Sequence, residues 1–253
     1  MAEAKKQEVP AVKSGTEVIN WQAELNVLTV ATAEAEKPSG NWVSFKGGVL
    51  TIGGNPMKGN RVEAIILHAV FENQWYKEKY DPTNPTSPHC YAIGETEDDL
   101  KPHPNALAPQ NDTCAGCPKN EWKSDPNGGK GKACKNVRRL AMIAAPDAST
   151  PEGVQKAEVA VAKLPVTSVK NWSTYASQIA SVLKLPPLAV RTEMLLEPDA
   201  KTQYQVNFLL VDKIEDGAII QALLNKRRET TDMIMMGYDK PTEATATATQ
   251  RKF

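Results

Sequence analysis

The chain has 253 residues, of which 41% are hydrophobic, 24% charged and 6% aromatic. This apolar content is enough to bury a core, which excludes a wholly disordered chain. No apolar run approaches the roughly 20 residues that span a bilayer, and the N-terminus lacks the apolar stretch of a secretory signal. We therefore expect a cytoplasmic protein with reduced thiols and no membrane partner. The 30 basic and 30 acidic side chains balance, which excludes a uniformly basic coat but allows a local basic patch.

The two ends of the chain differ in composition from the middle. Residues 1–15 show neither helical nor strand periodicity, and residues 241–253 are a low-complexity run of Thr, Ala and charged residues. Such segments cannot bury enough apolar surface to order themselves. We expect a flexible N-terminal arm (1–15), a body (16–240) and a flexible C-terminal tail (241–253).

Most of the predicted elements of the body are strands. Residues 42–45 and 49–52 flank Gly47-Gly48, which is typical of a hairpin, and residues 61–71 are rich in β-branched side chains, although a helix there is not excluded. Further strands are predicted over 137–144, 157–164, 188–196 and 203–211. Helical spacing predicts helices over 168–183, with Ser168 as N-cap, and over 214–228, ending in Lys226-Arg227-Arg228. The pattern indicates a β-rich α+β fold with one or two helices, its body an OB-like β-barrel.

The strand pattern is interrupted between residues 81 and 136. Residues 81–126 hold eight of the eighteen prolines and three of the four cysteines, with almost no aliphatic periodicity. A segment of this kind cannot form its own hydrophobic core. We expect it to be an insertion within the body, organised by something other than apolar packing.

The cysteines suggest what organises this insertion. Cys90, Cys114, Cys117 and Cys134 follow the spacing C-x23-C-x2-C-x16-C, and a C-x2-C pair directs both sulfurs toward one ion. A four-sulfur environment favours zinc, and four thiolates leave no open position, so we predict a structural zinc site of the zinc-ribbon type. Alternatives are a site in which His89 or His103 replaces a cysteine, a disulfide, an iron–sulfur cluster, or no site.

Charge is unevenly distributed over the insertion. From Cys117 to Arg139 there are seven basic and two acidic residues, a balance of +5, whereas residues 81–112 hold six acidic residues and one lysine, a balance of −5. The run Gly128-Gly129-Lys130-Gly131-Lys132 is a flexible basic loop suited to phosphates, but it lacks the spacing of a P-loop.

Aromatic residues are interleaved with these cations. Trp122 lies in the basic stretch, and Trp75-Tyr76-Lys77 is followed closely by Lys79, a composition typical of single-strand grooves. The structural alternatives are that Trp122 covers the metal site and that Trp75 to Tyr80 packs as a strand edge. The predicted nucleic-acid-binding residues are Trp75, Tyr76, Lys77, Lys79, Trp122, Lys123, Lys130, Lys132, Arg138 and Arg139.

The chain offers few catalytic groups. His68 lies in an apolar strand and is interpreted as a core residue, and no nucleophile elbow or H-E-x-x-H pattern is present. Glu95, Glu97, Asp98 and Asp99 form an acidic loop that we interpret as solvated, with a magnesium-dependent nuclease as a minor alternative. The sequence predicts a protein that is not an enzyme.

The cysteine segments resemble a group of tailed-bacteriophage proteins. The similar stretches are Pro88 to Ala92, Gln110 to Asn120 and Gly129 to Lys135, together with the downstream run Leu164 to Tyr175. The nearest functional analogy is with the zinc-containing single-stranded-DNA-binding proteins of phage replication, in which an OB-type barrel is interrupted by a zinc module. This chain differs from them because it lacks an acidic C-terminal tail, which weakens the expectation of tail-mediated recruitment.

The sequence and this resemblance lead to one functional expectation. The protein is expected to bind single-stranded DNA with little sequence preference, in phage DNA replication or recombination within a bacterial host. Phage replication proteins are expected partners, and formation of a homo-oligomer is left open. The alternative is a structural or protein-interaction component, a virion or transcription accessory, that uses the zinc module for docking.

Overall fold

The computed structural model describes residues 24–25, 27–29, 42–78, 86–126 and 128–238. The chain divides into two compact units, residues 1–38 and 39–253. In the first unit the described residues are helical; everything below concerns the second. The flexible ends expected at 1–15 and 241–253 lie outside the described residues. Within the described residues, no helix combines the length and apolarity needed to cross a membrane.

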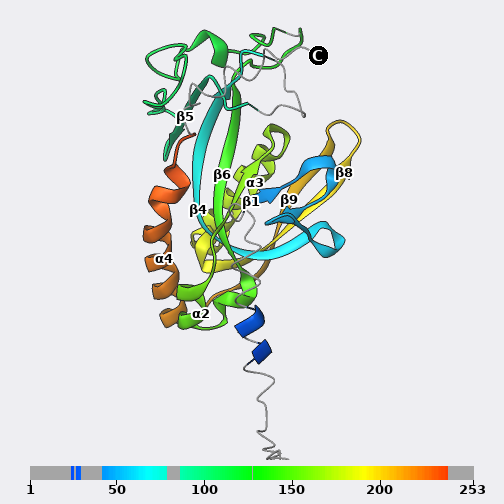
Figure 1. Ribbon diagram of the computed structural model, residues 1–253, viewed down its shortest axis with the longest axis vertical. Coiled ribbons are helices and arrows are strands. Elements are labelled where there is room, and N and C mark those ends of the chain that lie inside the picture. Colours follow the sequence, from blue (N-terminus) through cyan, green and yellow to red (C-terminus); the bar gives the residue numbers. More distant parts are fainter. Residues whose placement is uncertain (1–23, 26, 30–41, 79–85, 127, 239–253) are drawn as a thin grey trace, which may run out of the picture. The chain divides into compact units, whose positions relative to one another are not determined.

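One nine-stranded sheet forms the body (Figure 1). Its strands are β1 (Trp42–Ser44), β2 (Thr51–Ile52), β3 (Asn55–Pro56), β4 (Arg61–Trp75), β5 (Cys90–Gly94), β6 (Lys135–Ala144), β7 (Ala160–Leu164), β8 (Val190–Asp199) and β9 (Gln203–Lys213). Their order is β3-β2-β1-β7-β6-β4-β8-β9, and β5 pairs with β4. β1 and β7 pair in parallel, and the other described pairs are antiparallel.

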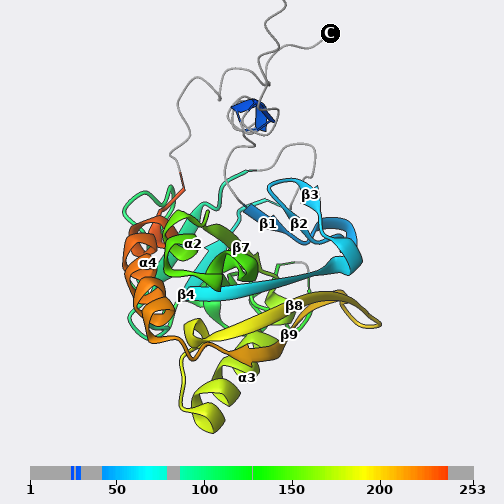
Figure 2. The same cartoon turned by 90° about the horizontal axis from the view of Figure 1, so that it is seen from below.

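The sheet curls into a half-barrel (Figure 2). No pairing among the described strands joins β3 to β9, so the two ends of the sheet are not hydrogen-bonded to each other. The coarse prediction of a β-rich α+β fold is confirmed. The curl follows from the twist that accumulates across long antiparallel strands.

Strand alternation gives the sheet two apolar faces. The inner face contributes Val43, Leu140 and Met194 to a core that is filled by Trp172 and Tyr175 of α3 (Val169–Gln178). Ile65 and Ile143 face outward instead and pack against α2 (Pro151–Lys156) and α4 (Gly217–Met235). Because successive strand residues point to opposite faces, β4 and β6 are buried on both sides where helices cover them.

The predicted elements correspond closely to the observed ones. All seven predicted strands are present, and the region 61–71 is a strand rather than a helix, although β4 is longer and ends at Trp75. Both predicted helices are present; α3 continues as a π-helical turn over Ile179–Leu183. β3, β5 and α2 were not predicted, because each is short and lacks a distinct periodicity.

Of two local predictions about helix ends, one holds for position only and the other was wrong. Ser168 is the N-cap residue of α3, but its side chain makes no cap hydrogen bond; its buried hydroxyl accepts a hydrogen bond from the backbone N–H of Val206 at 2.9 Å. Lys226 to Arg228 lie in the middle of α4, which continues to Met235. In both cases a contact with another element, not local sequence, sets the outcome.

The turn between β1 and β2 lies against Tyr204 of β9, so the two ends of the half-barrel are close together there. Gly47 and Gly48 both have positive φ, +64° and +74°, but only a Cβ at Gly48 would clash with the Tyr204 ring. We expect Gly47→Ala to cost about 1 kcal/mol because of backbone strain alone, and Gly48→Ala to cost more. Urea unfolding of the two variants and of Gly48→Ala combined with Tyr204→Ala checks this, because the double variant should return to the Gly47→Ala value. Equal losses for both single variants would contradict the contact.

Candidate metal centre and nucleic-acid interface

The cysteine-rich insertion (residues 81–136) lies at the end of β4 and β6 that is farthest from α2 (Figure 1). Its loops hydrogen-bond to the strand β5 and to each other. The backbone N–H of His103 donates to the Tyr91 carbonyl, and that of Cys114 donates to the Leu100 carbonyl, at 2.7 and 2.9 Å. The insertion therefore has backbone order in addition to whatever its cysteines supply.

The four cysteines come from three separate places but line one cavity of about 10 Å³. Cys90 begins β5, opposite Trp75 of β4, and Cys134 directly precedes β6. The pair Cys114 and Cys117 lies in a tight turn that Gly116 permits with a φ of +71°. A cavity of this size has room for about one water molecule or one small ion, not for an organic ligand.

The electrostatics of the cavity disfavour free thiolates. All four cysteines are free of disulfides. Burial, reinforced by the proximity of the other thiols, raises the pKa values of Cys90, Cys114 and Cys134, that of Cys134 to about 12. Three such groups ionise together only beside a compensating cation.

The four sulfurs have the chemistry of a zinc site but not the geometry of one that is already formed. Four sulfurs lining one small cavity match the chemistry of a soft, tetrahedral cation such as zinc. Yet, over the described ranges, no group of three or more His, Cys, Asp or Glu side chains is arranged so that it could hold a metal ion as it stands. The residues thus fit zinc by chemistry, and the sulfurs would have to draw closer together around it.

The two histidines near the cysteines have other contacts, and neither lines the cavity. His103 stacks on Tyr91, and its Nδ1 lies 2.8 Å from the Tyr91 hydroxyl. His89 meets the Trp75 ring edge to face. Neither histidine is therefore placed to replace a cysteine in lining this cavity.

Trp122 is the most exposed of the large hydrophobic side chains described, at 73%. The Lys132 Nζ lies 5.4 Å from the centre of its ring. Lys123 and Lys130 are exposed nearby in sequence. Trp122 does not line the cysteine cavity, whereas Trp75 does. The alternative in which Trp122 covers the metal site is therefore not what the structure has.

The predicted stretch from Trp75 to Lys79 is divided. Trp75 is half-buried, with the Lys119 Nζ 5.4 Å from its ring centre. The hydroxyl of half-buried Tyr76 donates to the Gln74 side chain at 3.0 Å. Lys77 is exposed, and Lys79 lies outside the described residues. The sequence missed Lys119 as a partner of Trp75, because they are 44 residues apart.

Arg138 and Arg139 face opposite sides of the sheet. On the inner face, the guanidinium of Arg138 stacks on the ring of Phe71, 3.2 Å from its centre. Phe71 was not predicted as a functional residue, because it reads as one more apolar residue of a buried strand. Phe71 and Arg138 are both half-buried. Two residues farther along β4, Asn73 is paired with Asn136 of β6.

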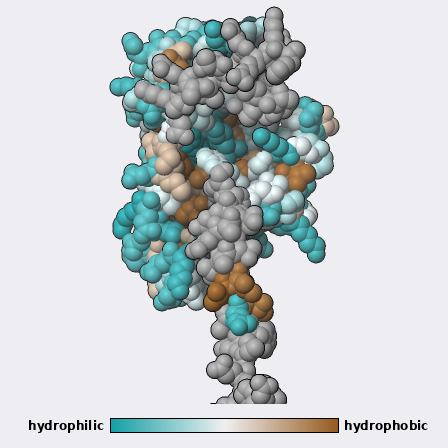
Figure 3. Space-filling view, in the orientation of Figure 1, coloured by the Kyte–Doolittle hydropathy of each residue, from teal (hydrophilic) through white to brown (hydrophobic). Residues whose placement is uncertain are grey.

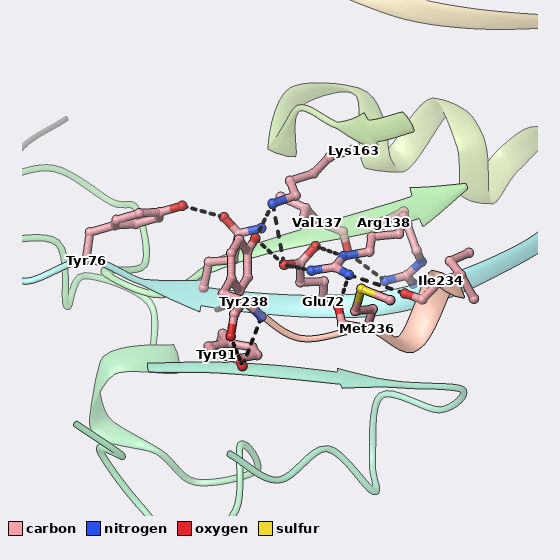
Figure 4. A network of polar contacts seen from close by, with 11 residues as sticks. Glu72, Tyr76, Tyr91, Val137, Arg138, Lys163, Ile234, Met236 and Tyr238 are labelled. Carbon is pink, nitrogen blue, oxygen red and sulfur yellow. Dashed lines mark hydrogen bonds and ion pairs between the residues drawn. The ribbon is translucent and has the colours of Figure 1, made fainter. Parts of the chain in front are cut away.

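Arg139 is a correction to the predicted interface, because it is buried and already paired. Its Nε and Nη2 donate to the two carboxylate oxygens of fully buried Glu72 at 2.6 and 2.8 Å, and Nη1 donates to the Met236 carbonyl at 2.7 Å. Lys163 and Tyr238 complete the cluster around Glu72 (Figure 4), with the Tyr238 hydroxyl donating to Glu72 at 2.6 Å. A guanidinium in this position is not available to a phosphate.

The remaining candidates are one buried histidine and four exposed acidic residues. His68 is buried, as interpreted from its apolar strand, with partners on both ring nitrogens. The acidic side chains Glu95, Glu97, Asp98 and Asp99 are exposed, and Asp99 accepts a hydrogen bond from Thr96 at 2.8 Å. The visible surface of the described part of the insertion is mostly hydrophilic (Figure 3).

Comparison with protein-family models, with curated proteins and with solved structures gives no match for this chain.

Proposed function

We propose that this protein binds single-stranded DNA, with little sequence preference, through the insertion and the adjoining inner face of β4 and β6. The observation that carries the proposal is the exposure of Trp122 beside Lys132. A large aromatic ring left in water beside a cation is a platform on which any unpaired base can stack. Stacking uses the ring face that every base has, so it gives affinity without sequence readout.

Cations around Trp122 supply the contacts with phosphates. Lys123 and Lys130 are exposed, and Lys77 is exposed beyond the end of β4. Contacts of this type release counterions from the strand, so affinity should fall steeply as salt rises. The second ring, Trp75, has Lys119 over it and would extend the same surface.

The half-barrel would serve the function that an OB-like barrel serves in such proteins. Its inner face presents the stacked pair of Phe71 and Arg138. A bound DNA strand that contacts Trp75 would continue along β4 over this pair. The zinc-ribbon-like insertion would hold Trp122 in place through a zinc ion on Cys90, Cys114, Cys117 and Cys134. The setting in phage DNA replication or recombination rests on the resemblance of the cysteine segments.

The test compares two exposed tryptophans. Fluorescence anisotropy with labelled oligo-dT at about 50 mM salt should show binding, and Trp122→Ala should weaken it by about 1–3 kcal/mol, or roughly 5- to 150-fold. Trp42, which is 50% exposed on β1, provides the control, since Trp42→Ala should leave affinity unchanged. Lys130→Ala should lower the slope of log K against log salt by about 0.7.

Two results would count against the proposal. One is an absence of oligo-dT affinity at low salt, which would favour a structural or docking role instead. The other is an equal loss for Trp122→Ala and Trp42→Ala, which would mean that the exposed ring of the insertion is not the stacking platform.

A further inference from the structure

A second cavity, of about 190 Å³, lies at an interruption in the pairing of β4. On one edge, β8 pairs with Arg61 to Ala64 and β5 pairs with Phe71 to Trp75. Between them a β-bulge at Leu67 shifts the register with β6, and no described strand pairs with this edge. The cavity occupies this gap, is many times larger than the cysteine cavity, and has room for several water molecules.

The walls of this cavity come from both faces of the sheet. Trp172 of α3 reaches it from the inner face, and Arg227 of α4 reaches it from the outer face. Pro186, Pro187 and Leu188 close it along the free edge. A ligand here would have one apolar end, against Trp172, and one end beside a guanidinium.

The state of Arg227 identifies the charge of that ligand. Arg227 Nη2 lies 3.2 Å from Nδ1 of His68, and Nε2 of His68 lies 2.8 Å from Oε1 of Glu95. Since a guanidinium only donates, Nδ1 accepts from Arg227. The contact partner of Arg227 is therefore a ring nitrogen and not a carboxylate.

Three other arginines of the fold, Arg61, Arg139 and Arg191, each pair with a carboxylate. Within the described part of the chain, Arg227 has no ion pair, although it is half-buried beside a cavity with an apolar wall. A guanidinium in this position favours an anion that can accept two parallel hydrogen bonds from it.

We propose that this cavity binds an apolar carboxylate, with its carboxylate on Arg227 and its hydrocarbon or aromatic body against Trp172. The same chemistry is offered by a free small molecule and by the C-terminal residue of a peptide. The site is separate from the proposed DNA surface and does not depend on it.

Calorimetric titration with phenylacetate, with its uncharged analogue phenylacetamide, and with a short peptide ending in phenylalanine tests the proposal. We expect phenylacetate to bind at least ten times more tightly than the amide. Arg227→Met should remove that preference, and Arg227→Lys should retain part of it. Arg228 provides the matched control: it is exposed on the same helix and bonded to Asn225, so Arg228→Met should bind like the unmodified chain.

The outcomes are distinguishable from loss of folding and from failure of the DNA proposal. Oligo-dT affinity and thermal unfolding of each variant report whether the fold is intact. Tighter binding of the peptide than of phenylacetate would identify a chain terminus as the source, and the reverse a free metabolite. Equal affinity for acid and amide, no binding of any probe, or an unchanged preference in a folded Arg227→Met variant would overturn the proposal.

Discussion

Arg139→Met is expected to destabilise the fold by about 3–5 kcal/mol, because it leaves the carboxylate of Glu72 buried without its partner. Glu72 is fully buried and accepts two hydrogen bonds from Arg139. Removing one member of such a pair costs far more than removing both. Urea unfolding at pH 7 measures the loss, and a variant that also carries Glu72→Leu should recover most of it.

The pH dependence separates this explanation from a simple packing defect. Burial would raise the pKa of Glu72, but hydrogen bonds and charge from Arg139, with the charge of Lys163, outweigh it and hold that pKa below its usual value of 4.5. The pair therefore stabilises the fold above about pH 4.5, and the contribution is lost as pH falls through the lower, folded-state pKa. Without Arg139, burial should raise the pKa of Glu72, so the variant should gain stability on lowering the pH from 7 to 5.

A surface pair provides the control for this experiment. Arg191 lies 3.5 Å from Asp212, with both side chains partly exposed. Arg191→Met should cost at most about 1 kcal/mol. Similar losses for Arg191→Met and Arg139→Met, or a stability of the Arg139 variant that simply declines toward pH 5, would contradict the role of the buried charge.

Chelation is expected to destabilise the protein by several kcal/mol and to release one zinc ion per chain. The physical reason is that burial disfavours the thiolate forms of Cys90, Cys114 and Cys134 by raising their pKa values. A bound dication would offset that cost by forming metal–sulfur bonds. Zinc content by atomic emission and thermal unfolding before and after chelation measure both effects. Zinc-free protein should also bind oligo-dT more weakly.

Two variants make this experiment specific. Cys117→Ser should contain no zinc, and its unfolding temperature should not respond to a chelator, whatever the substitution itself costs. His89→Ala changes a neighbour of Cys90 that does not line the cavity, so it should retain the metal. Zinc-free protein after growth and purification with added zinc, or loss of zinc from His89→Ala, would exclude the four-cysteine site.

Periodicity predicted the strands well because each long strand is buried on at least one face. In β4, residues Ala64 to Leu67 and Val70 are buried. An apolar run of this kind is either a strand or a buried helix, and its β-branched side chains favoured the strand. β5 escaped prediction because Cys90 to Gly94 is short and lies among prolines. Its pairing with β4 is a contact between segments that local composition does not indicate.

The roles of individual cations were harder to predict than the elements that carry them. Arg138 and Arg139 are adjacent and chemically identical, yet one stacks on Phe71 and the other pairs with buried Glu72. Adjacent strand residues point to opposite faces, so one of the two had to face inward. Arg139 is the one that pairs with a buried acid, because Glu72, 67 residues earlier in the chain, lies beside it.

Composition and periodicity alone therefore establish a β-rich body, its interruption by a proline-dense segment, and a set of four cysteines with metal-like spacing. Those features depend on residues that are close together in the chain, so the sequence shows them directly. The burial of Arg139, the exposure of Trp122 and the opening beside Arg227 depend on long-range packing. They arise only when the curl of the sheet brings distant segments together, because burial and charge pairing are properties of surroundings in space.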